Sequence, residues 1–204
     1  MIEYLVAGGP VMIPIALCSV IALAVFLERL WALRRERVVP RRLNVQASEL
    51  ARQLRFDDAI TLCRTWDVAL ARVLEMALME RVQPRVHIKE RLEEVGRRET
   101  AEMERGIPVL GTVASIAPLL GLLGTVGGMI LTFQVIQEQG LGNVANLAGG
   151  ISQALITTFA GLTVGIPSVV ANRYLLSRVD QLVLDLESAS LDMLEVLDEA
   201  EDAA

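Results

Sequence analysis

The residues that could do chemistry in the apolar part of this chain carry hydroxyl and amide groups rather than charges. From Gly106 to Asn172 the only charged side chain is Glu138, which lies near the boundary of an apolar run. Threonine and glutamine donate and accept hydrogen bonds, but they do not take up or release a proton near neutral pH. If this segment crosses a membrane and conducts protons, a partner must therefore supply the titrating group.

The chain carries no motif of an enzyme or a metal centre. It has no Gly-x-Ser-x-Gly, no His-Glu-x-x-His and no pair of carboxylates within an apolar segment. The two cysteines, Cys18 and Cys63, have no Cys or His neighbour at ligand spacing, and His87 opens a highly charged segment. We expect packing cysteines, a solvated histidine, no cofactor, no metal and no enzymatic activity.

Two long apolar segments, 106–136 and 151–172, each have one helical face made of unusually small residues. Gly124 with Gly128, and Gly161 with Gly165, have the four-residue spacing that lets helix backbones approach closely. Tight packing explains such faces, and a threonine hydroxyl can bond the carbonyl one turn back. By themselves they indicate an oligomeric or tightly packed membrane bundle. The small residues are Gly111, Ala114, Pro118, Gly121, Thr125, Gly128 and Thr132, then Gly150, Ala154, Thr157 or Thr158, Gly161, Gly165 and Ser168.

The elements that must position these residues are three membrane-spanning helices. The composition, 53% hydrophobic and only 4% aromatic, fits a small all-α membrane protein. Seventeen of the nineteen Lys and Arg lie between Arg29 and Arg105, and Lys- and Arg-rich loops stay in the cytoplasm. The first apolar run has no positive charge before it and is expected to be a retained anchor rather than a cleaved signal peptide. We predict a periplasmic N-terminus (1–4), spans at 5–27, 106–136 and 151–172, a cytoplasmic helical region (28–105), a periplasmic loop (137–150) and a cytoplasmic acidic tail (173–204).

The predicted cytoplasmic parts have helical periodicity. Apolar residues recur through Leu50, Leu54, Ile60 and Cys63, and a second segment has its apolar residues on one face. We expect 85–136 to form one very long helix and the tail, with nine acidic and no basic residues after Arg178, to continue the third span as an amphipathic helix. The apolar residues that share one face of the second segment are Leu70, Val73, Leu74, Ala77 and Leu78.

Two stretches resemble the signature spans of the MotA/TolQ/ExbB proton-channel family. They are Ala117-Pro-Leu-Leu-Gly-Leu-Leu-Gly-Thr-Val-Gly-Gly-Met129 followed by Phe133, and Gly150-Ile-Ser-Gln-Ala-Leu-Ile-Thr-Thr-Phe-Ala-Gly-Leu162 followed by Ile166 and Pro167. The resemblance covers essentially the whole chain, and three spans fit the ExbB/TolQ branch better than the four-span MotA type. It implies a homopentameric ring in the bacterial inner membrane, with long cytoplasmic helical extensions.

The resemblance also implies site residues. The polar pore positions of the family fall on Thr125 and Thr158, with Thr157 beside them, so these hydroxyls are expected to line the ion pathway. Many family members have Glu where this chain has Gln153, which keeps the hydrogen-bonding shape but cannot titrate. Gln153 is therefore expected to bond a partner, line the outer vestibule or cap contacts between helices. We assign helix packing to Gly121, Gly124, Gly128, Gly161 and Gly165.

The partners that the resemblance implies are an ExbD-like single-span protein, whose membrane Asp carries the proton, and a TonB-like energy transducer, alongside membrane lipids. The proton motive force would then energise transport across the outer membrane. A TolQ-like role in envelope integrity and a non-conducting scaffold remain as alternatives, and the residues do not decide between proton and sodium.

Overall fold

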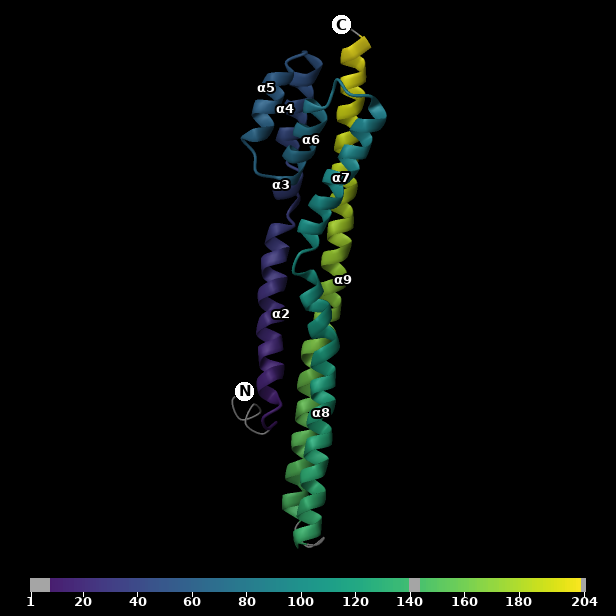
Figure 1. Cartoon of the computed structure of the whole chain (residues 1–204). Helices are drawn as coiled ribbons and strands as arrows, with labels where there is room; N and C mark the ends of the chain where they lie inside the picture. Colours follow the sequence, from purple (N-terminus) through teal and green to yellow (C-terminus); the bar gives the residue numbers. More distant parts are fainter. Residues whose placement is uncertain (1–7, 140–143, 203–204) are drawn as a thin grey trace. The chain divides into compact units, whose positions relative to one another are not determined.

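The computed structural model describes residues 8–139 and 144–202, and most of these are helical, with no strand among them. They form two compact units. Figure 1 labels the helices and colours them by residue number. The first unit, here called the apolar unit, comprises the described residues of 1–28 and 106–174. The second, the charged unit, comprises 29–105 and the described residues of 175–204. The predicted N-terminal segment 1–4 and the centre of the predicted loop lie outside the described residues.

Three helices are long and apolar enough to cross a membrane: α2 (Met12–Ala32), α8 (Ile107–Gln139) and α9 (Val144–Asp202). Their most apolar windows have mean hydropathies of 2.1, 1.9 and 1.8. At 1.5 Å per residue, the 21 residues of α2 span about 31 Å, close to the thickness of a hydrocarbon core. Only 11%, 28% and 28% of the residues in these windows are buried in the single chain, as expected of surfaces that meet lipid or neighbouring subunits. The prediction of an all-α protein with three apolar spans is confirmed.

The prediction of one helix over 85–136 is wrong. Helix α7 (Arg85–Glu104) ends before Gly106, which has a φ of 85°, and α8 begins at Ile107. Glycine takes this left-handed conformation without the steric cost that a Cβ adds, and it commonly ends helices, with proline shortly after. Gly106 followed by Pro108 was the stop signal in the sequence. The other continuity prediction is confirmed, because α9 runs without a break from the third apolar segment through the acidic tail.

The charged unit contains α3 (Arg35–Val38), α4 (Arg41–Arg52), α5 (Phe56–Arg64), α6 (Ala69–Met79), α7 and the C-terminal part of α9. Helix α5 packs on α4 and α6, and α6 packs on α7. The predicted apolar face of α6 is buried in full. The predicted stripe through Leu54 is wrong, since Leu54 is exposed and has a φ of 59° where α4 ends. Helix α4 instead buries Leu43, Ala47 and Ala51.

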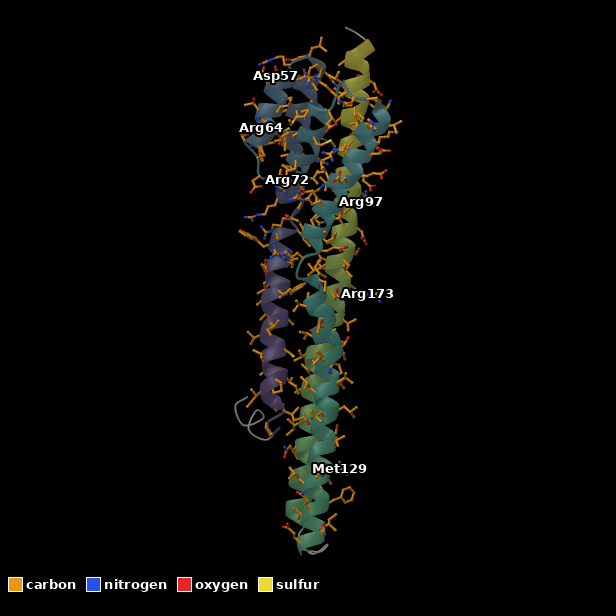
Figure 2. All side chains as sticks on the ribbon, viewed as in Figure 1. Asp57, Arg64, Arg72, Arg97, Met129 and Arg173 are labelled. Carbon is orange, nitrogen blue, oxygen red and sulfur yellow. The ribbon has the colours of Figure 1, made fainter. Side chains whose placement is uncertain are left out.

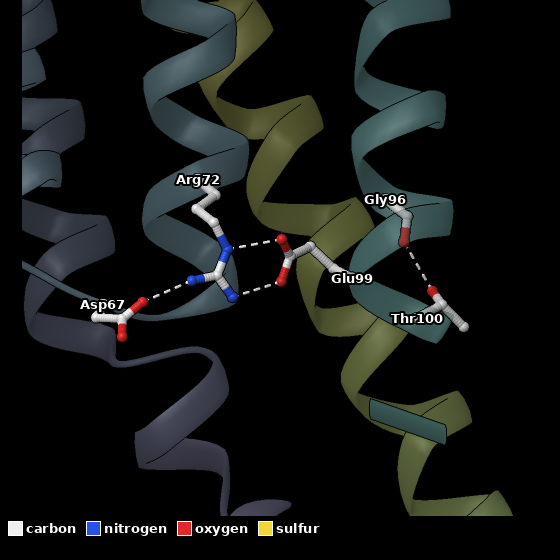
Figure 3. A network of polar contacts seen from close by, with 5 residues as sticks. All are labelled: Asp67, Arg72, Gly96, Glu99 and Thr100. Atoms are coloured by element: carbon white, nitrogen blue, oxygen red, sulfur yellow. Dashed lines mark hydrogen bonds and ion pairs between the residues drawn. The ribbon is translucent and has the colours of Figure 1, made fainter. Parts of the chain in front are cut away.

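Ion pairs add to this core. The Arg72 guanidinium binds both carboxylate oxygens of Glu99 at 2.6 Å and one oxygen of Asp67 at 2.8 Å, which ties α6 to α7 and to the turn before α6 (Figure 3). Glu99 is almost completely buried, so this bidentate pair removes a carboxylate from water and compensates it with two charge-assisted bonds. Donating these hydrogen bonds to Glu99 raises the pKa of Arg72. Figure 2 shows the nitrogen and oxygen atoms gathered around Arg72 and Arg64, whereas carbon dominates around Met129 of α8.

Candidate ion pathway on helices α8 and α9

The small faces of α8 and α9 meet within one chain, and they meet backbone to backbone. A Cβ added to Gly161 would lie 2.5 Å from the carbonyl oxygen of Ala117 and 2.9 Å from the Cα of Gly121. A Cβ on Gly121 would lie 3.1 Å from the Cα of Thr158. Only glycine permits this approach. Figure 1 shows α8 and the N-terminal part of α9 running side by side.

The other glycines assigned to packing lie along the same contact. A Cβ on Gly128 would be 2.6 Å from the carbonyl oxygen of Gly150, and one on Gly165 would be 2.6 Å from the Cγ of Pro118. Gly124 faces the side chain of Thr157, which fills the space that a Cβ would need. By contrast, a Cβ on Gly127 would meet nothing within 4 Å. The small residues therefore first serve the pairing of α8 with α9 inside the subunit.

Thr125 and Thr158 bring two hydroxyls together across this contact. Their Oγ1 atoms lie 3.1 Å apart, and the Thr158 hydroxyl is also 3.2 Å from the carbonyl oxygen of Gly121 on α8. The Thr125 hydroxyl lies 2.8 Å from the carbonyl oxygen of Leu122 in its own helix. Each hydroxyl has a single proton and two acceptor lone pairs. Both protons thus have acceptors within the chain, and the remaining lone pairs of these half-buried groups can accept from outside.

Thr157 has a different environment from Thr158. Its side chain is fully buried and its hydroxyl donates within its own helix, 3.0 Å from the carbonyl oxygens of both Gln153 and Ala154. It packs against Gly124 of α8. Of the three threonines predicted to line the ion pathway, Thr125 and Thr158 are therefore the two whose side chains are only half-buried.

Gln153 lies against the chain segment that precedes α2. Its amide nitrogen occupies the position where a Cβ on Gly9 would be, and Gly9 itself has a φ of 71°. The half-buried Gln153 side chain therefore fills space beside a backbone turn of the same chain. The role of Gln153 in the ion pathway stays a prediction.

Two polar residues on this contact were missed as candidates. The amide nitrogen of Asn172 would lie 3.0 Å from a Cβ on Gly111, and the buried Thr132 hydroxyl donates to the carbonyl oxygen of Gly128 at 3.0 Å. Asn172 ends the uncharged run of α9, and Gly111 is the first glycine on the small face of α8, so matching the two ends of these faces would have paired them. With the Thr125–Thr158 pair, they give the helix contact polar groups at several levels.

The remaining candidate chemistry lies outside the spans. Cys63 is buried in the charged unit, and burial, followed by the nearby charge of Glu75, raises the pKa of its thiol to about 11. The thiol therefore stays neutral at physiological pH, as a packing cysteine does. Across residues 8–139 and 144–202, His, Cys, Asp and Glu side chains form no group of three or more that could hold a metal ion.

Comparison with known proteins finds a match to the MotA/TolQ/ExbB proton channel family over residues 65–188. A Synechocystis protein named ExbB-like 1 is 33% identical over 189 residues, which cover 89% of this chain and 72% of that protein. The biopolymer transport protein ExbB of Aquifex aeolicus is 41% identical over 87 residues, covering 43% of this chain and 59% of that protein. The Tol-Pal system protein TolQ of Haemophilus influenzae is 39% identical over 88 residues, covering 43% of this chain and 39% of that protein.

Proposed function

Because the chain belongs to the MotA/TolQ/ExbB proton channel family, we propose that it is the ring-forming subunit of an ExbB-type stator in the bacterial inner membrane. In this proposal several copies, five by analogy with the family, surround an ExbD-like single-span partner. Proton flow then drives a TonB-like transducer that energises transport across the outer membrane. The names of the ExbB relatives support the transport role.

The observation that carries the proposal is the Thr125–Thr158 hydroxyl pair in a segment without a titratable side chain of its own. Between Gly106 and Asn172 only Glu138 is charged, so the proton carrier must come from another chain. A partner helix with a carboxyl group supplies it. The threonine pair then offers two hydroxyl groups to that carboxyl group at one level of the α8–α9 contact.

The hydrogen-bond arrangement suggests how the pair serves the partner. Since both threonine protons already have acceptors, the pair accepts most readily from the protonated carboxylic acid, from water or from hydronium. When the acid loses its proton, rotation of one hydroxyl lets it donate to the carboxylate instead. Two rotatable hydroxyls can therefore form hydrogen bonds with both the protonated and the ionised carboxyl group of the partner, and they stay uncharged themselves.

The test removes the hydroxyls while keeping the shape. Thr125→Val and Thr158→Val should leave assembled rings but abolish substrate uptake through a TonB-dependent transporter, whereas the Ser variants should retain part of it. Matched controls are Thr112→Val and Thr163→Val, exposed threonines on the same two helices whose hydroxyls bond only their own helix. Wild-type uptake in both pore variants would remove the pair from the ion path and favour a non-conducting scaffold.

The proposed topology places the loop 137–150 in the periplasm and 28–105, with the tail, in the cytoplasm. It rests on the positions of Lys and Arg in the sequence. A Cys introduced at Asn143, which lies outside the described residues, should react with an impermeant thiol reagent added from the periplasm. A Cys introduced at Arg91 should not, and reversed labelling would overturn this orientation.

A TolQ-like role in envelope integrity is the second candidate, because two TolQ proteins match with 39% and 37% identity over stretches of similar length to the ExbB match. Co-purification of the native complex separates the two. A TonB-like transducer supports the first proposal, and a Tol-type transducer supports the second.

A further inference from the structure

The charged unit begins with a dense run of arginines. Residues 29–42 contain six arginines and one glutamate, and they follow directly on the apolar run of α2. Arg35 binds Asp185 of α9 at 2.8 Å. Arg34, Arg41 and Arg42 are exposed and form no ion pair with any residue between 8–139 or 144–202. Their charge is therefore open to a partner outside the chain.

An aromatic residue stands at the start of this run. Trp31 is 54% exposed, and the guanidinium carbon of Arg37 lies 3.2 Å from the centroid of its ring. Leu30, beside it, is also exposed. Tryptophan favours the layer between hydrocarbon and headgroups. The guanidinium stacked on it keeps its planar set of donors, which matches the oxygens of a phosphate group.

We propose that the segment from Leu30 to Arg42 binds anionic phospholipids. The acyl chains lie against Leu30 and Trp31, and the phosphate of the headgroup meets Arg34, Arg37, Arg41 and Arg42. A lipid is the occupant that fits because the segment continues a membrane-spanning helix, so an apolar surface is followed directly by one that carries Arg34, Arg41 and Arg42 without ion-pair partners among the residues that the structure describes. This proposal requires only that α2 reaches the headgroup layer, and it is independent of proton conduction.

The test measures headgroup selectivity on the purified full-length protein. The protein is equilibrated with mixed micelles containing equal amounts of phosphatidylglycerol and phosphatidylcholine with the same acyl chains, and retained lipids are counted by native mass spectrometry. Wild type should retain phosphatidylglycerol in excess. The triple variant Arg34→Gln, Arg41→Gln, Arg42→Gln should lower that excess at least about tenfold, because each basic residue near an anionic surface contributes separately.

The matched control removes the same charge elsewhere in the charged unit. Arg52→Gln, Arg97→Gln, Arg98→Gln replaces three exposed arginines that form no ion pair among the described residues, and it should keep the wild-type excess. Arg37→Lys keeps the charge but loses the planar stack, so it should lower the excess only a few-fold. Equal retention of the two lipids by wild type, or an equal loss in both triple variants, would overturn the proposal.

Competition with inorganic phosphate distinguishes a lipid site from a site for free phosphate. Inorganic phosphate in large excess should leave the lipid ratio unchanged, because it gains nothing from Leu30 and Trp31. Complete displacement of phosphatidylglycerol by inorganic phosphate would show a phosphate site rather than a lipid site.

Discussion

The apolar and charged units hold their helices together by opposite means. In the apolar unit, α8 and α9 touch through backbone atoms at Gly121 and Gly161, where side chains are missing. In the charged unit, large aliphatic residues such as Leu74 fill the core, and the Arg72–Glu99 pair is added to it. Lipid provides no hydrophobic drive for helices to associate, so close van der Waals contact must do it, whereas in water burial of apolar area suffices.

This difference predicts different sensitivities. The apolar unit should respond to added volume and should be nearly indifferent to pH and salt, because its helix contact contains no charge. The charged unit should tolerate small changes of volume better and should respond to pH and to the loss of ion-pair partners. Both tryptophans, Trp31 and Trp66, belong to the charged unit, so tryptophan fluorescence reports on that unit alone.

The largest effect is expected from bulk placed between α8 and α9. Gly121→Leu or Gly161→Leu forces backbones apart and should destabilise the subunit by about 3 kcal/mol or more, which should reduce ring assembly in mild detergent. Native mass spectrometry measures the oligomers. The control Gly127→Leu meets open space and should assemble normally. Unchanged oligomers in both contact variants would show that the backbones do not need to touch.

The next effect tests the ion pair of the charged unit. Arg72→Met leaves the buried Glu99 carboxylate without its partner and should cost about 2–3 kcal/mol, less than for a fully buried pair because Arg72 is 42% exposed. Arg55→Met breaks an exposed pair with Asp58 and should cost at most about 1 kcal/mol. Urea unfolding followed by tryptophan fluorescence compares them. Equal losses of unfolding free energy in the two variants would mean that burial of the Glu99 carboxylate does not increase the cost of removing its partner.

A smaller effect concerns alkaline pH. The unfolded Cys63 thiol loses its proton near pH 9.0, whereas the folded thiol keeps it until about pH 11. The contribution of this thiol to the free energy of unfolding is therefore fully present below pH 9. It falls by about 2 kcal/mol as the pH rises to 11, because the unfolded chain releases the proton first. Cys63→Ala should remove this part of the slope. The same slope in the variant would assign it to other groups.

The smallest effect is expected at Gln153. Its amide packs beside Gly9 and cannot titrate, so Gln153→Ala should cost under about 1 kcal/mol and leave substrate uptake intact. Gln134→Ala, an exposed amide on α8, is the control. Lost uptake in the Gln153 variant alone would give this side chain a role in the ion path despite the missing carboxylate.

Several features of the fold could be predicted from local patterns. Long uncharged runs predicted the three apolar helices, and the face of α6 followed from its periodicity. The breaks at Leu54 and Gly106 were not predicted, although both residues take positive φ. Leucine does not mark a turn in a sequence, so the positive φ of Leu54 follows from the packing of α4 on α5. Gly106 followed by Pro108 did mark a helix end, but the long apolar run after it favoured the prediction of one continuous helix.

The sequence by itself determined that the predicted spans carry no titratable Asp, Glu, His, Lys or Arg and that each of two spans has a small face, because both follow from residue types and helical periodicity. It could not decide what those faces touch. Only the tertiary structure paired Gly161 with Gly121, buried Thr157 and brought Thr158 to within 3.1 Å of Thr125. Neighbouring threonines differ by 100° around a helix, so the rotation of α9 against α8 decides which hydroxyl meets its counterpart.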